Sequence, residues 1–506
     1  MTGKGLLILS CVLALFSAKA FSGTYNFTPG CEKAWQSVIM FRFDEAEEIL
    51  KNEATSDPSN LFPVYIGSYI DFLILFTGED RALYEKIKSR RESTLDKLAT
   101  GDRSSPYYRY CIADVTLKWA IVRLKFREYT AAGLELRRVN EIVKENHSLH
   151  PGFLPNQLQL GIMHALAGLV PENYKWLAGL IGFEGDLDQG FNEIGRIAGY
   201  TGPDLFPRTL KAPACLFAAM INATLRNNRE TALAMVGRFD HDPDLIPFAG
   251  SPIIRYAKST IYLKTGNSGK TAEILANRQD APGTYRMCFL DYLYGLARLN
   301  QLDPEASVSF RAFLSGFKGV NYIKSSWQKI AWTALIKGDT NAYRQYMRMA
   351  LSQGNRDVDE DKQAYYEASS GVIPNVTLLK ARLLNDGGYG RRALDVLLNQ
   401  SLTQYVRGKH ELAEYYYRLG RIYQSLEQDD RALQYYSQAI RTGRDLPQYF
   451  AGGAALQSGI IHEQAGRYSK ADSSFRLCIS LDFTEYKTSL SQKAKAGVSR
   501  VKKHLR

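Results

Sequence analysis

The sequence predicts an all-α fold, a superhelix of antiparallel helix pairs that repeat along the chain. No segment shows the alternation of apolar and polar residues that a half-buried strand requires. Tyrosine is abundant, with 31 residues, and its ring can fill the gap between neighbouring helices. Near the C-terminus, small residues recur in two series with a constant spacing of 39 positions, and such a period indicates stacked repeats. The first series is Ala393, Ala432 and Ala471, and the second is Ala381, Gly420 and Gly459.

Helix pairs are expected along most of the chain, because apolar residues recur at helical spacing and proline or glycine punctuates the ends. Residues 161–190 are apolar on almost every side, which predicts burial on several faces and a packing centre for the N-terminal half. The acidic patch at 357–361 indicates a solvated linker. The expected helical segments are 32–56, 63–76, 81–99, 107–126, 129–146, 212–239, 252–276, 285–313 and 327–351.

Residues 1–20 are typical of a secretory signal peptide. Lys4 supplies a short positive region, residues 6–16 form an apolar run, and Ala18-Lys19-Ala20 is a small-x-small cleavage site. The run is shorter than the roughly 20 apolar residues of a membrane-spanning helix. Lipidation at Cys11 stays open as an alternative to cleavage after Ala20. The mature chain is therefore expected to be exported, and to be periplasmic or associated with the outer membrane if its source is bacterial.

Cysteine usage and charge constrain the chemistry broadly. Five cysteines follow Cys11, widely spaced and without a C-x-x-C pair, so zinc and thioredoxin-type sites have no local support. We expect most of these thiols to be small buried residues in helix interfaces, and their disulfide pairing stays open. The formal charge of +12 favours acidic partners or an anionic surface.

Three copies of one pattern lie between residues 376 and 481, and the clearest copy spans 414–441. Its characteristic residues are Tyr416, Leu419, Gly420, Tyr423, Ala432, Tyr436 and Ala439. This copy resembles the tetratricopeptide repeat (TPR), and the copies at 376–400 and 455–481 resemble it less closely. The period is 39 rather than about 34 residues, and Arg444 stands where the closing proline of the pattern would lie. The resemblance implies a TPR-like solenoid.

A looser similarity rests on two further segments. The sequence Gly-Leu-Ile-Gly-Phe-Glu-Gly-Asp at 179–186 and the helix end at 332–339 are similar to the eukaryotic TPR family associated with the mitochondrial outer membrane and inclusion clearance. That similarity bears on the fold more than on the function, because the signal peptide predicts export rather than a mitochondrial location.

The TPR resemblance also implies where a partner would bind. Such repeats bind peptides or proteins along the concave face that the first helix of each pair lines. In the clearest copy this open face would carry Glu414 and the candidate partner-binding residues Tyr417, Arg418, Arg421 and Gln424. Two arginines beside a tyrosine suit a carboxylate or an acidic peptide, because a guanidinium can donate two parallel hydrogen bonds. The two-residue carboxylate clamp of some family members is not reproduced, and a solvated helix face is the alternative.

Three motifs contain residue types found in ligand-binding or catalytic sites, but they are better explained as loops. Residues 266–271 resemble the end of a phosphate-binding loop, but Lys264 stands at the position of its leading glycine. The acidic run 240–244 lacks the spacing of a calcium loop. His147 and His150 lie in a loop rich in proline and glycine, with no pair of acids nearby in the sequence. No catalytic fingerprint occurs, so we expect no enzyme activity, no cofactor and no metal site.

The tail 486–506 carries seven Lys or Arg residues and no acid. Apolar residues on one face predict a capping helix for the repeat array, and attachment to an anionic membrane surface or to an acidic partner is the alternative. The expected organisation is a signal peptide (1–20), a divergent repeat domain (21–356), an acidic linker (357–375), a regular TPR array (376–485) and this basic helix (486–506).

The leading hypothesis is an exported, non-enzymatic TPR scaffold that binds protein or peptide partners, but not nucleic acid, in a cell envelope. The alternative is an envelope solute-binding protein that holds an oligosaccharide or another small ligand, with Tyr174 and Trp176 stacked on a sugar. The sequence does not predict an oligomeric state.

Overall fold

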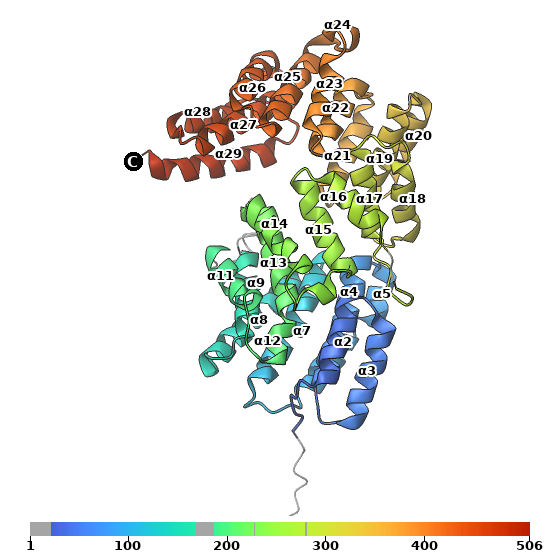
Figure 1. Cartoon of the computed structure of the whole chain (residues 1–506), viewed down its shortest axis with the longest axis vertical. Coiled ribbons are helices and arrows are strands. Elements are labelled where there is room, and N and C mark those ends of the chain that lie inside the picture. The colour runs from blue at the N-terminus through green and yellow to red at the C-terminus, as the bar shows by residue number, and fades with distance from the viewer. Residues whose placement is uncertain (1–21, 168–186, 227, 279–280, 506) are drawn as a thin grey trace, which may run out of the picture. The chain divides into compact units, whose positions relative to one another are not determined.

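The computed structural model describes residues 22–167, 187–226, 228–278 and 281–505 (Figure 1). In these ranges the chain is mostly helical, and its β-contacts are two isolated bridges, so the all-α prediction is confirmed. Across the same ranges, every helix is too short or too polar to cross a membrane. Outside them lie the expected signal peptide with Cys11, the centre of the apolar segment 161–190, and the segment 179–186.

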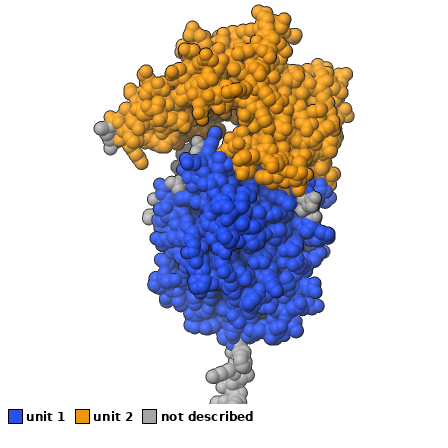
Figure 2. All heavy atoms as spheres, viewed as in Figure 1, with its two compact units in different colours: residues 1–261, 278–289, 317–319 blue, residues 262–277, 290–316, 320–506 orange. Residues whose placement is uncertain are grey.

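The chain divides into two compact units (Figure 2). Their limits differ from the expected organisation, in which the boundary falls at the acidic linker. Unit 1 comprises Met1–Ile261, Arg278–Phe289 and Phe317–Gly319, and unit 2 comprises Tyr262–Asn277, Leu290–Gly316 and Val320–Arg506.

Unit 1 is built from helix pairs. The segment 81–99, expected as one amphipathic helix, forms two short helices, and the other expected segments of this unit appear as pairs or single helices. The helices are α2 (Pro29–Ile39), α3 (Phe43–Ser56), α4 (Phe62–Gly78), α5 (Arg81–Ile87), α6 (Arg90–Leu98), α7 (Pro106–Lys125), α8 (Tyr129–Leu149), α9 (Asn156–Ala167), α11 (Leu187–Ala198), α12 (Leu205–Thr209), α13 (Lys211–Ile221), α14 (Arg229–Gly237) and α15 (Pro252–Lys264), which ends in unit 2.

A buried ion pair fixes α4 against α7 in the core of unit 1. The Lys118 ammonium lies 2.9 Å from the Asp114 carboxylate and 3.1 Å from the centroid of the Tyr69 ring. The hydroxyls of Tyr65 and Tyr69 donate to the same carboxylate at 2.9 and 2.7 Å. Burial lowers the pKa of Lys118 to about 8 despite the attraction of Asp114. Loss of either partner would leave the other charge buried and uncompensated.

Unit 2 continues the helix pairs in regular order. Its helices are α16 (Ser268–Ala276), α17 (Phe289–Leu299), α18 (Ala306–Gly316), α19 (Ile323–Ile336), α20 (Thr340–Ser352), α21 (Asp359–Ser370), α22 (Val376–Asp386), α23 (Gly390–Leu398), α24 (Leu402–Tyr405), α25 (Gly408–Ser425), α26 (Asp429–Gly443), α27 (Phe450–Gln464), α28 (Tyr468–Ser480) and α29 (Lys487–Val501).

The small residues of the 39-residue period lie where paired helices approach most closely. A Cβ atom on Gly420 would lie 2.4 Å from the Tyr436 ring, and one on Gly459 would lie 2.5 Å from the Phe475 ring. Within each pair, an aromatic ring on the second helix thus fills the space that the glycine on the first helix leaves. The alanines of the period, Ala393, Ala432 and Ala471, are fully buried.

The acidic segment 357–375 is not a solvated linker in the structure, because most of it forms α21. Asp361 is fully buried, and its carboxylate accepts backbone N–H groups of Tyr322 and Ser325 at 2.6 and 2.8 Å. These N–H groups lie at the start of α19 and have no partner within that helix. Asp361 therefore supplies the acceptor that the helix end lacks.

The basic tail forms α29, which buries Ala494, Gly497 and Val501 and packs on α28 and α27. Arg500 donates two hydrogen bonds to Glu463 at 2.7 and 2.7 Å, which ties the helix to α27. This packing is the one that a capping helix requires.

Candidate functional site

The first helices of successive pairs in unit 2 lie side by side in the order α19, α22, α25 and α27. Two cation–π contacts bridge neighbouring helices. The guanidinium carbon of Arg382 lies 5.2 Å from the centroid of the Trp332 ring, and that of Arg418 lies 5.7 Å from the centroid of the Phe450 ring. Basic side chains therefore lie in the seams between the first helices. We call four of them the basic row: Lys329 on α19, Arg382 on α22, and Arg418 and Arg421 on α25.

Two members of the basic row are paired with acids one helical turn away. Arg418 lies 2.6 Å from Glu414, and Arg382 lies 3.6 Å from Asp386. Burial opposes the charge on Arg418, but Tyr449 and Glu414 more than offset this effect and raise its pKa above the ordinary value. Arg418 is therefore a fixed positive charge at any accessible pH.

Lys329 has no acidic partner among the described residues. It is 8% exposed, and its ammonium donates to the side-chain Oε1 of Gln328 at 2.6 Å and lies 3.9 Å from the centroid of the Trp332 ring. The nearby Glu367 carboxylate is occupied by hydrogen bonds from Gln328, Trp332 and Tyr343 at 2.6, 2.7 and 3.1 Å. Burial and, after it, the neighbouring Arg382 lower the pKa of Lys329 to about 8. Burial removes the water that would otherwise solvate this ammonium, so an anion beside it would stabilise its charge.

Arg421 is the second member of the basic row without a salt bridge in the described chain. Its guanidinium donates to the Tyr417 hydroxyl at 3.5 Å, and its side chain is partly exposed. A guanidinium that donates one long hydrogen bond keeps most of its donors for a ligand. The row thus holds two paired and two unpaired cations.

A tetratricopeptide repeat model matches residues 413–442 and 453–485, which are the pairs α25–α26 and α27–α28. The chain carries tetratricopeptide repeats. Among solved structures, it is similar to the P58(IPK) TPR domain, at 14% identity over 84% of this chain and 96% of that chain, with a TM-score of 0.22. It is also similar to the APC/C hetero-tetramer Cut9–Hcn1, at 13% identity over 91% of this chain and 87% of that chain, with a TM-score of 0.27. No curated protein matches the chain.

These TM-scores are too low for either structure to inform the partner of this chain, and the fold class rests on the helices themselves. The looser similarity to the mitochondrial inclusion-clearance family is not shown by the comparisons and stays a prediction. TPR arrays generally serve as non-catalytic scaffolds that bind protein partners on extended surfaces.

The residues predicted for the open face of the TPR at 414–441 lie at different depths. Tyr417 and Arg418 are 5% and 8% exposed, because α27 packs on this side of α25 and brings Phe450 to 5.8 Å from the Tyr417 ring. The side-chain Oε1 of Gln424 accepts a hydrogen bond from the Tyr436 hydroxyl at 2.6 Å, so Gln424 is bonded to the second helix of its own pair. Arg421 and Gln424 are the partly exposed members of the predicted set.

The predicted set does not include Lys329, Trp332 and Arg382. Arg382 precedes Arg421 by 39 residues, so the period places both arginines at the same position of successive repeats. That signal could have found Arg382. Lys329 and Trp332 lie in a divergent pair without the period, and their relation to Arg382 depends on how α19 packs against α22.

The other motifs are structural where they are described. Residues 266–271 span the turn between α15 and the start of α16, as expected. In the run 240–244, Asp242 and Asp244 pair with Lys211 at 3.0 and 2.8 Å, and Asp240 pairs with Lys258 at 2.6 Å, so each carboxylate has a cationic side chain beside it.

Two further predictions concern the cysteines and the residues proposed to contact a sugar. The five described cysteines are free, and all except Cys288 are buried. Tyr174 and Trp176, on which the oligosaccharide hypothesis rests, lie outside the described residues.

Proposed function

We propose that the chain is a non-enzymatic TPR scaffold and that unit 2 binds an acidic segment of a protein partner along the basic row. The observation that carries this proposal is the presence of two cations that form no salt bridge within the described residues, Lys329, which is 8% exposed, and Arg421, which is partly exposed, on the first helices of the array. Lys329 is also desolvated, so an approaching carboxylate gains a charge interaction without first displacing a full hydration shell.

The surroundings of the row favour a peptide over a simple anion. Three acids, Asp386, Glu414 and Glu367, accompany four cations, so the row keeps a net charge of about +1, by which a complementary partner is steered toward it. Aromatic rings lie between the charges: Trp332 contacts both Lys329 and Arg382. Alternating charge and ring contacts suit an acidic segment that also carries apolar side chains.

A fluorescently labelled polyglutamate peptide provides the probe, with polylysine of the same length as its opposite. We expect the anisotropy of polyglutamate to rise on addition of the protein, and the affinity to fall with salt because exposed charges are screened. Lys329→Met and Arg421→Gln should each weaken binding about tenfold, since a hydrogen bond to a charged group contributes about 1.5–3 kcal/mol.

The matched control is Arg441→Gln, an exposed arginine on the second helix α26. It has the same charge change outside the basic row and should leave binding unchanged. Equal loss of affinity in this control would show that net charge rather than the row attracts the peptide. Equal binding of polylysine would show that the sign of the peptide's charge does not decide binding, and would contradict the proposal.

We further propose that the protein is exported and acts in a cell envelope, which rests on residues 1–20. Fractionation of the source cells should place the protein in the envelope fraction, and sequencing of the mature N-terminus should begin at Phe21. A lipid-modified N-terminus at Cys11 would select the lipoprotein alternative, while an intact Met1 in the cytoplasmic fraction would refute export.

The outer side of α29 is proposed as a contact with an anionic membrane surface. Four lysines on α29 and on the 3-10 turn that follows it (Lys502–His504) are exposed and form no salt bridge with the described residues, whereas Arg500 and Lys487 are engaged with Glu463 and with backbone carbonyls. Vesicles that contain phosphatidylserine should bind the protein, and neutral phosphatidylcholine vesicles should not. The four lysines are Lys493, Lys495, Lys502 and Lys503.

Neutralising the four lysines to glutamine tests this contact without removing the cap. We expect vesicle binding to disappear while the melting temperature stays unchanged. Full retention of membrane binding in this variant would contradict the attachment.

A further inference from the structure

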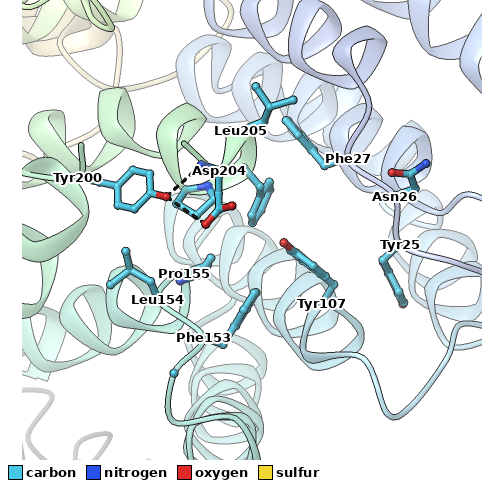
Figure 3. A pocket seen from close by; sticks show the side chains of 13 residues that line it. Tyr25, Asn26, Phe27, Tyr107, Phe153, Leu154, Pro155, Tyr200, Asp204 and Leu205 are labelled. Carbon is cyan, nitrogen blue, oxygen red and sulfur yellow. Dashed lines mark hydrogen bonds between the residues drawn. The ribbon is translucent and has the colours of Figure 1, made fainter. Parts of the chain in front are cut away.

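Unit 1 contains a pocket of about 420 Å³ on its own surface, independent of the TPR array (Figure 3). Four segments far apart in the sequence form it: the extended stretch 25–27, the start of α7, the loop 152–155 and the start of α12. Small-molecule sites in proteins have volumes of about 300–1,000 Å³. The pocket is therefore large enough for a small organic ligand and too small for a folded partner.

Aromatic rings form the walls of this pocket. The ring of Tyr107 stands at 84° to that of Phe153, with centroids 4.9 Å apart, and at 78° to that of Phe206, with centroids 5.4 Å apart. Phe27 and Tyr200 line further sides. Rings at near right angles present π-faces in several directions, and each face carries negative electrostatic potential.

A single carboxylate, that of Asp204, accompanies these rings, and no Lys, Arg or His lines the pocket. Asp204 accepts the Tyr200 hydroxyl at 3.1 Å and forms no salt bridge within the described residues. The Tyr107 hydroxyl has no hydrogen-bond partner in the described chain, and in Figure 3 it points toward the side of the pocket where Asp204 lies. A ligand therefore meets negative potential from the rings and from the carboxylate together.

The pocket is held in shape by hydrogen bonds outside it. The Tyr25 hydroxyl donates to the Leu98 carbonyl oxygen at 2.9 Å, and the Asn60 side chain bonds the backbone of Asn26 in both directions, at 2.8 and 3.2 Å. These bonds fix the extended segment that carries Phe27. A preformed site loses little conformational entropy when a ligand binds.

We propose that this pocket binds a small organic cation, with an alkylammonium group held against the aromatic rings and Asp204 as its counter-charge. Aromatic cages of this composition recognise quaternary and substituted ammonium groups, because the positive charge is attracted to the ring faces and sheds its water at low cost. An anion is disfavoured by the same groups.

Choline is the probe, and its uncharged isostere 3,3-dimethylbutan-1-ol is the matched control ligand. Isothermal titration of the full chain should show binding of choline, and the isostere should bind at least about tenfold more weakly because only the charge differs. Glucose tests a neutral polyhydroxylated ligand in the same experiment. Equal affinity for the isostere, binding of glucose in place of choline, or no binding of choline at millimolar concentration would each overturn the proposal.

Two variants locate the site. Asp204→Asn keeps the shape of the side chain and should lower choline affinity at least about tenfold, whereas Asp96→Asn, an exposed carboxylate on α6 outside the pocket, should leave it unchanged. Phe153→Leu should lower affinity by a smaller factor. Retained affinity in Asp204→Asn would overturn the assignment. The comparison between choline and its isostere in the unmodified protein decides the question if that variant is unstable.

Discussion

Replacing Gly420 by alanine sets two physical effects against each other in the repeat array. Gly420 lies inside α25, where alanine is the better helix former by about 1 kcal/mol. The same position faces Tyr436 on α26, and an added Cβ would lie 2.4 Å from two carbons of the ring. Helix propensity predicts stabilisation and packing predicts destabilisation, so the sign of the change identifies which effect dominates.

The structure favours packing. Tyr436 is fully buried, and its hydroxyl is held by Gln424 at 2.6 Å, so the ring cannot swing away without breaking that bond. Overpacking a tight core costs about 1–3 kcal/mol. Set against the propensity gain of about 1 kcal/mol, we expect Gly420→Ala to destabilise unit 2 by up to about 2 kcal/mol.

Urea unfolding of the full chain, followed by circular dichroism, measures this free energy, and a double-mutant cycle isolates its cause. In the background Tyr436→Leu the ring is gone, and Gly420→Ala should become stabilising. The control is Gly195→Ala on α11, where nothing lies within 4 Å of an added Cβ, so this change should stabilise unit 1 by about 1 kcal/mol. Stabilisation by Gly420→Ala in the otherwise unmodified chain would refute the reasoning.

Three further predictions follow from buried charges. Between about pH 8 and 10.5 the unfolded chain keeps a proton that folded Lys329 has released, so stability should rise with pH across this interval, and Lys329→Met should remove that part of the rise in urea titrations. Asp114→Asn leaves Lys118 buried without its counter-charge and should cost about 3–5 kcal/mol at neutral pH, measured by calorimetry. Asp361→Ala removes the acceptor of two backbone N–H groups and should destabilise the start of α19 by about 1–3 kcal/mol, which hydrogen exchange of Tyr322 and Ser325 would detect. Unchanged values in these three experiments would contradict the assigned roles of the buried charges.

Local pattern was sufficient to predict most of the helices and the close-approach positions, although α21 was expected as a linker and 81–99 as a single helix. Gly420 and Gly459 recur at a fixed interval because each must leave room for a ring on the following helix. The glycine and the ring belong to the same helix pair, so the pattern can be recognised within one repeat. The same period also relates Arg382 to Arg421. Features that repeat with the helix pair can therefore be found without the structure.

Features that depend on distant packing could not be predicted. Asp361 belongs to an acidic run that is typical of a solvated segment. Its carboxylate is nevertheless buried, and it accepts hydrogen bonds from backbone N–H groups 36 and 39 residues away in the sequence. Lys329 forms no salt bridge within the described residues because the nearby Glu367 carboxylate bonds Gln328, Trp332 and Tyr343 instead, and only tertiary structure reveals this. Arg418 was expected on an open face and is mostly covered, because α27 approaches from that side.

Hydrogen exchange of the full chain with and without polyglutamate tests the central claim most directly, because protection reports where the backbone is stabilised by a ligand. Binding along the basic row predicts slower exchange in α19, α22 and α25, with no change in α29 or in unit 1. Protection confined to α29, whose exposed lysines offer the competing positive surface, would contradict the assignment of the partner site to the first helices of the array.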